Sequence, residues 1–169
     1  MYNKTQRLLA SIRGRKRYAY LEEYEGLQWL SRERLLNLQF VRLKQLLVHA
    51  YVTTPYYRDV FQEAGCHPDD IRTCQDFAKL PVLTKKLVKE NGNKMISSSF
   101  LKSDLRANTS GGSTGEPLSF YQDHDVFEQM YANQMLALKM AGWSGRECIV
   151  QLWGNPKDSK KVSLAQRIR

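Results

Sequence analysis

The apolar residues of the first half of the chain recur with the period of an α-helix. After Ser31, apolar side chains follow at alternating steps of four and three, at Leu36, Phe40, Leu43, Leu47 and Ala50. This spacing predicts one apolar face, packed in the core, on a helix of about 20 residues with Ser31 as its N-cap. Pro55 ends that helix and begins a second one over residues 56–64, which Gly65 closes.

Two further short helices are predicted between residues 73 and 92. Thr73 and Asp76 have the spacing of a capping box, and Thr84 precedes a helical run over residues 85–90 that Asn91 and Gly92 end. Residues 27–104 are therefore expected to form a helical segment with short connections. Residues 1–26 precede it as a basic N-terminal segment that holds, at most, a short and loosely packed amphipathic helix.

The pattern changes at Leu105, where short apolar runs alternate with glycine and polar residues. Residues 105–109 and 118–121 are predicted to be strands, joined by an exposed turn. Asp125 and Glu128 have the spacing of a capping box for a helix that ends at Gly142, and residues 148–153 are predicted to form a buried strand. The fold class is therefore expected to be α/β, with a helical N-terminal segment followed over residues 105–169 by the beginning of an incomplete α/β domain.

Composition and charge restrict the class of protein further. The chain has 169 residues, of which 42% are hydrophobic, so we expect an ordered chain rather than a disordered one. No apolar run approaches the roughly 18 residues that a membrane span needs, and the basic N-terminus lacks a secretory signal, so a cytoplasmic location is expected. The net charge of +9 lies at the two ends, within residues 1–17 and 157–169. Nucleic acid is disfavoured, because its readers usually spread basic residues over a folded face, but residues 1–17 leave peripheral membrane contact open.

The cysteines predict neither a disulfide scaffold nor a metal site. Cys66, His67 and Cys74 lie close in sequence, but they lack paired C-x-x-C spacing and a fourth ligand. We expect Cys66 and Cys74 to be ordinary buried thiols in a reducing compartment. No nucleophile and base can be paired from spacing, so no catalytic residue is predicted.

The segment with candidate chemistry is the loop NTSGGSTGEP, residues 108–117. Its three glycines let backbone N–H groups approach an anion, and the hydroxyls of Ser110, Ser113 and Thr114 add donors, so a polyphosphate is the implied ligand. The loop has no lysine and a strand is expected after it, so neither the Walker A pattern nor the dinucleotide fingerprint fits. Composition alone is equally compatible with a simple hairpin turn.

The order of the loop residues resembles the phosphate-binding signature of the adenylate-forming enzymes. The resemblance is strongest to the phenylacetate-CoA ligase-like branch, which includes capsule-biosynthesis (CapK-like) members. In that branch an arginine precedes a Ser/Thr/Gly loop that ends in Gly-x-Pro, which corresponds here to Arg106 and to residues 115–117. Residues 49–61, 76–91, 143–146 and 152–154 also resemble this branch, so the resemblance runs from about Trp29 to about Gly154.

The resemblance implies an ATP-dependent ligase that activates a carboxylic acid as an acyl-adenylate. Pyrophosphate leaves, and the acyl group then passes to coenzyme A or another acceptor. ATP and magnesium are the implied cofactors. The implied phosphate-binding residues are Thr109, Ser110, Gly111, Gly112, Ser113, Thr114 and Gly115, and Arg106 is implied either to contact phosphate or to brace the strand.

The chain also departs from the family pattern. Glu116 stands where many relatives have lysine, and family members are more than twice as long. The family's magnesium-binding loop, its ribose-binding aspartate and its C-terminal catalytic lysine have no counterpart in the sequence. We therefore expect an N-terminal fragment of such a ligase that is inactive alone, with the missing C-terminal part as a candidate partner chain. A basic helical module that binds nucleic acid or an acidic membrane surface, and an inactive remnant, stay open as alternatives.

Overall fold

The chain is mostly helical, with one small two-stranded sheet. The computed structural model describes Leu8, Ile12 and residues 14–110, 117–144 and 147–150. Its elements, with η marking 3-10 helices, are α2 (Arg17–Leu27), α3 (Arg32–Thr53), α4 (Pro55–Glu63), η1 (Pro68–Asp70), α5 (Cys74–Phe77), α6 (Lys85–Asn91), η2 (Gly92–Met95), η3 (Lys102–Asp104), β1 (Arg106–Thr109), β2 (Ser119–Gln122) and α7 (His124–Met140).

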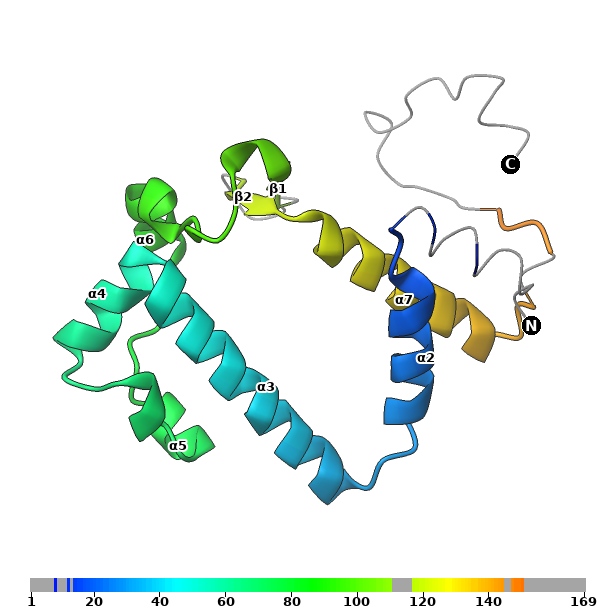
Figure 1. Cartoon of the computed structure of the whole chain (residues 1–169), viewed down its shortest axis with the longest axis horizontal. Helices are drawn as coiled ribbons and strands as arrows, with labels where there is room; N and C mark the ends of the chain where they lie inside the picture. Colours follow the sequence, from blue (N-terminus) through cyan, green and yellow to red (C-terminus); the bar gives the residue numbers. More distant parts are fainter. Residues whose placement is uncertain (1–7, 9–11, 13, 111–116, 145–146, 151–169) are drawn as a thin grey trace.

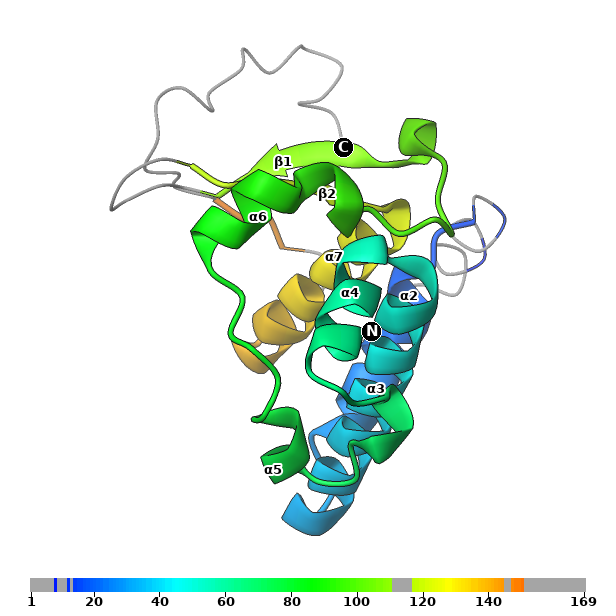
Figure 2. The same ribbon diagram turned by 90° about the vertical axis from the view of Figure 1, so that its left-hand side faces the viewer.

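The long helix α3 connects two groups of elements (Figure 1). The C-terminal half of α3 contacts α4 and η1. At its N-terminal end, a short connection joins α3 to the preceding helix α2, which packs against α7. Helix α7 begins directly after strand β2, so it connects this contact to the sheet. Figure 2 shows the sheet and α6 together at one end of the molecule.

Most helix ends lie where the capping residues predict them. The Ser31 hydroxyl accepts a hydrogen bond from the Arg34 amide at the start of α3. The Thr84 hydroxyl accepts one from the Leu87 amide at the start of α6. Thr73 and Asp76 form the predicted capping box of α5. Gly65 follows α4 with a φ of +62°, a conformation that suits glycine and ends the helix. These predictions are confirmed.

The helix α7 begins two residues earlier than the sequence indicates. Asp123 is its N-cap and accepts a hydrogen bond from the Val126 amide at 2.9 Å, so the predicted capping box of Asp125 and Glu128 is wrong. Both carboxylates instead face α2, where Asp125 accepts from the Tyr20 hydroxyl and Glu128 binds Arg17. Contacts between two helices thus use the side chains that local spacing had assigned to a cap.

The predicted apolar face of α3 is only partly buried. Leu47 packs with Phe61 and Ile71 in the core, and Leu43 lies against this cluster. Leu36 of the same face is 53% exposed, because α4 and η1 pack on the C-terminal half of α3. The expectation of a fully packed face is therefore wrong for its N-terminal half.

The chain after α7 does not form the predicted strand in the residues that are described. Cys148, Ile149 and Val150 have no regular secondary structure, and Val150 is 83% exposed because no strand pairs with this segment. Residues 151–153 of that prediction lie outside the described part. Within the described part, no helix has the length and apolar character needed to cross a membrane.

Candidate phosphate-binding site

The two predicted strands pair as an antiparallel hairpin, and the glycine-rich loop connects them. Arg106 lies opposite Gln122 and Thr109 lies opposite Ser119 in the register of β1 and β2. The Asn108 amide donates to Gln122 Oε1 at 2.8 Å across the pair. The hairpin predicted from the sequence is therefore confirmed, and it brings both ends of the loop together.

Ser110 closes the hairpin at the base of the loop. Its backbone amide donates to the Leu118 carbonyl oxygen at 2.9 Å, and its Oγ accepts from the Leu118 amide at 2.9 Å. An accepting hydroxyl keeps its own proton for donation. Ser110 therefore fixes the geometry of the loop ends through two bonds to Leu118.

The remaining predicted phosphate ligands divide into two groups. Thr109 is exposed at the end of β1, next to the loop. Gly111, Gly112, Ser113, Thr114 and Gly115 lie outside the described residues, so their phosphate-binding role and the predicted exposed turn stay predictions.

Arg106 has a contact that suits a bracing role. Its guanidinium carbon lies 5.3 Å from the centre of the Phe127 ring of α7, within the range of a cation–π interaction. The arginine thus links β1 to the helix that follows the hairpin. Sequence spacing gave no sign of Phe127 as its partner, because that contact joins two separate elements.

The helix α7 is held in turn by a buried ion pair with α2. Glu128 is 2% exposed. Its carboxylate accepts hydrogen bonds from the Arg17 backbone amide at 3.0 Å, from Arg17 Nε at 3.0 Å and from Arg17 Nη2 at 2.6 Å. These hydrogen bonds lower the pKa of Glu128 and raise that of Arg17. A hydrogen bond to Asp125 raises the pKa of Tyr20 to about 12. The sequence pattern does not indicate this network, because Arg17 belongs there to a run of basic residues near the N-terminus, far from Glu128.

Lys16 also pairs with Asp125, at 3.1 Å. Two basic residues of the segment 1–17 therefore contact acidic residues of α7.

The described residues include no group of three or more potential metal ligands among His, Cys, Asp and Glu. Cys66 is half-buried and Cys74 is exposed, so the expectation that both are buried thiols is wrong. His67 is the N-cap of η1, where its Nδ1 accepts from the Asp69 amide at 3.3 Å. Its position is explained by this local contact.

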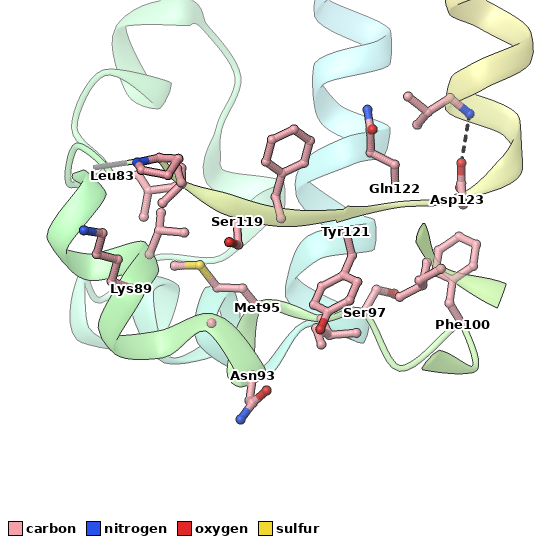
Figure 3. A pocket seen from close by; sticks show the side chains of 18 residues that line it. Leu83, Lys89, Asn93, Met95, Ser97, Phe100, Ser119, Tyr121, Gln122 and Asp123 are labelled. Atoms are coloured by element: carbon pink, nitrogen blue, oxygen red, sulfur yellow. Dashed lines mark hydrogen bonds between the residues drawn. The ribbon is translucent and has the colours of Figure 1, made fainter. Parts of the chain in front are cut away.

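A pocket of about 740 Å³ lies beside the hairpin, between β2 and the segment that runs from α6 through η2 (Figure 3). Most of its walls are apolar, and they include Met95, Phe100 and Phe120. Tyr121 points from β2 toward the η2 segment. Local sequence does not indicate this pocket, because one wall comes from the segment that ends at Met95 and the other from β2, which begins at Ser119.

The fold and the hairpin together define a mostly helical chain with a candidate phosphate-binding loop. Several curated proteins are similar to this chain in sequence. The phenylacetate-coenzyme A ligase of Escherichia coli (strain K12) is 34% identical over 132 residues, which are 77% of this chain and 30% of that ligase. The ligase of Aromatoleum evansii is 34% identical over 56% of this chain and 22% of its own length. The ligase of Pseudomonas putida is 34% identical over 60% of this chain and 24% of its own length.

These relatives confirm the predicted resemblance: the chain is phenylacetate-CoA ligase-like over the matched residues. The chain spans less than a third of the length of the curated relatives that it matches. No family model matches it.

Proposed function

We propose that this chain is the phosphate-loop part of an ATP-dependent ligase that activates a carboxylic acid as an acyl-adenylate. The observation that carries the proposal is the hairpin of β1 and β2, whose glycine-rich loop occurs in a chain similar to phenylacetate-coenzyme A ligases. The acid would be phenylacetate or a related compound, and coenzyme A would be the acyl acceptor. We also propose that such a ligase would act in capsule or other polysaccharide biosynthesis.

The role proposed for the loop is to bind the β- and γ-phosphates that leave as pyrophosphate. Ser110 suits this role, because its bonds to Leu118 close the loop and its hydroxyl, which accepts one of them, can also donate to a phosphate oxygen. The amides and hydroxyls of residues 111–115 would supply the other donors, since fixed dipoles stabilise charge on a transferring phosphate. Arg106 would brace the strand through Phe127.

Magnesium enters the proposal through the resemblance alone. In the described part, no cluster of ligands is available to hold it. A metal that accompanies ATP would therefore have to be held mainly by the phosphates or by other parts of a ligase.

Binding of ATP and of inorganic pyrophosphate to the full chain, measured by NMR chemical-shift changes, tests the loop. We expect a Kd no better than about 1 mM, or about 4 kcal/mol, because other contacts of a complete ligase are missing. Gly112→Val is expected to abolish the shifts, since the added side chain obstructs the approach of phosphate to the backbone.

Gly26→Ala is the matched control, because a Cβ at Gly26 of α2 meets open space. It should leave ATP and pyrophosphate binding unchanged, and the thermal midpoint should stay the same or rise slightly. Equal binding by wild type and Gly112→Val would contradict the proposed phosphate site.

A further inference from the structure

The turn that follows α4 is held by an unusual kind of cap. His67 is the N-cap of η1, a position that serine, threonine, aspartate or asparagine usually fills. Its Nδ1 accepts from the Asp69 amide at 3.3 Å, and its own amide donates to the Asp70 carboxylate at 2.7 Å. Before α5, the hydroxyl of Thr73 caps in the same way by accepting from the Asp76 amide. The two caps differ because an imidazole nitrogen gains a proton in mild acid and a hydroxyl oxygen does not.

The turn that His67 caps is packed into the core. Pro68 of η1 is almost inaccessible to solvent, and Ile71, directly after η1, is 3% exposed. Ile71 packs with Leu47 of α3 and Phe61 of α4. The cap therefore positions a segment that contributes to the largest apolar cluster around α3, and a change in the cap would be felt there.

The observed cap requires a neutral imidazole. Nδ1 of His67 accepts a hydrogen bond only when it carries no proton, so in this arrangement the ring proton lies on Nε2. Protonation would set two N–H donors, the ring Nδ1–H and the Asp69 amide, against each other. Histidine side chains gain this proton between about pH 8 and pH 5. The hydrogen bond to the Asp69 amide is therefore lost within that range.

An acceptor for the protonated ring already lies beside it. Asp69 Oδ2 is 3.2 Å from His67 Nδ1, so the new Nδ1–H can donate to the carboxylate of the same residue whose amide it releases. Both side chains are at least half exposed, and an ion pair between exposed groups contributes little to stability. Protonation thus exchanges a backbone cap for a weak side-chain ion pair.

The other groups that face the ring do not replace the lost bond. Lys44 of α3 donates to the Pro68 carbonyl oxygen at 2.6 Å and lies 4.0 Å from Asp69 Oδ1. Tyr51 of α3 lies edge-on to the imidazole, with the ring centroids 4.9 Å apart. The Asp70 carboxylate already accepts from the amide of the N-cap residue. A cation, an aromatic ring and an engaged carboxylate leave the Asp69 amide without a new partner.

We propose that His67 is a pH-sensitive cap, which holds η1 on α3 while its imidazole is neutral and releases the Asp69 amide when it is protonated. The proton comes from solvent and binds Nδ1, which then donates to the Asp69 carboxylate. The released amide turns to water, so η1 is held less tightly at pH 5 than at pH 8. The buried side chains of Pro68 and Ile71 are more accessible in the protonated form.

NMR of the full chain between pH 8 and pH 5 tests the cap. We expect the Asp69 amide resonance to move with the same midpoint as the ring protons of His67. Exchange of that amide, corrected for its intrinsic pH dependence, should accelerate about fivefold, as the loss of one cap implies. The Asp76 amide is the internal control, because its cap is a hydroxyl and bonds from Lys79 and Thr73 lower the pKa of the Asp76 carboxyl. It should show no step in this range.

Three variants separate the cap from other sources of a step. His67→Asn keeps an acceptor at the N-cap that does not titrate, so the Asp69 amide should stay in one state throughout. His49→Asn is the matched control, because His49 contacts Thr53 and Ser97 and has no contact with η1, and it should keep the step. Asp69→Asn removes the carboxylate but keeps the amide, so the step at residue 69 should persist.

A step at Asp69 that survives in His67→Asn would overturn the proposal. So would a step that disappears in Asp69→Asn, because it would then arise from the carboxylate, or an Asp69 amide that does not follow the titration of His67. Far-UV circular dichroism of each variant should match the wild type at pH 8.

Discussion

Glu128 shows how one buried carboxylate links elements that are distant in sequence. It lies on α7, is almost inaccessible to solvent, and accepts three hydrogen bonds from Arg17 of α2. The guanidinium of Arg17 also lies 4.4 Å from the centre of the Tyr131 ring. A charge in such a place is tolerated because its partner and donors are fixed.

Removing this carboxylate should destabilise the chain strongly. We expect Glu128→Ala to lower the free energy of unfolding by about 3 kcal/mol, because Arg17 would keep a largely buried charge without its partner. Denaturant unfolding followed by circular dichroism measures the effect. Glu90→Ala is the control, because it removes only an exposed pair with Lys86 and should cost less than about 0.5 kcal/mol. Equal losses in both variants would contradict the structural role of the α2–α7 pair.

Ser110 offers a second test at the level of single residues. Ser110→Ala removes the acceptor of the Leu118 amide and should cost about 1 kcal/mol, so hydrogen exchange of that amide should accelerate about fivefold. Ser119→Ala, at an exposed site on β2, should leave the exchange rate nearly unchanged. An unchanged rate in Ser110→Ala would show that the hydroxyl does not close the hairpin.

At the scale of elements, the packing of α2 on α7 should depend on pH. Hydrogen bonds from Arg17 and Tyr20 lower the pKa values of Glu128 and Asp125 below their ordinary values of 4.5 and 3.8. A lowered folded-state pKa contributes stability above the unfolded-state pKa and loses it as the pH falls through the folded-state value. Tyr20 has the opposite sign: its contribution is complete below pH 10 and is lost as the pH rises through about 12.

We therefore expect the thermal midpoint to fall between pH 5 and pH 2 as the two carboxylates become protonated. In Glu128→Gln the midpoint should start lower at pH 7 and fall less on acidification, because one of the two groups no longer titrates. Scanning calorimetry at several pH values measures both slopes. Parallel curves for the two proteins would contradict the assignment of this pH dependence to Glu128.

At the scale of the whole molecule, few side chains are buried among the residues that the structure describes. The described hydrophobic core consists of Leu21, Leu47, Phe61, Ile71 and Ala132. The α2–α7 contact and helix α4, which carries Phe61 of the core cluster, lie on opposite sides of the molecule in Figure 1. Much of the apolar surface of the described residues is therefore exposed.

The isolated chain is not expected to adenylate a carboxylic acid. The chain spans less than a third of the curated ligases that it matches, so we expect the loop alone to bind phosphate without activating an acid. Pyrophosphate exchange with a panel of aryl and alkyl acids should remain at background. Acid-dependent exchange above that level would contradict the prediction.

Local sequence was sufficient for the caps of α3, α5 and α6, the turn at Gly65 and the two strands that flank the loop. The side chains of Ser31, Thr73 and Thr84 each accept from the backbone amide three residues later, so their roles follow from spacing. The pairing of β1 with β2 is similarly local, because a short loop brings consecutive strands together. The loop order also indicated the ligase resemblance, which the curated relatives confirm.

Contacts between distant elements set the remaining features, which the residue pattern did not indicate. Asp125 and Glu128 have the spacing of a cap, yet they bind Tyr20 and Arg17, more than 100 residues earlier in the chain. Leu36 has the spacing of a core residue, yet it is exposed, because packing partners meet only the other half of α3. Periodicity specifies which side chains share a face, but burial and ion pairing depend on which element lies against that face.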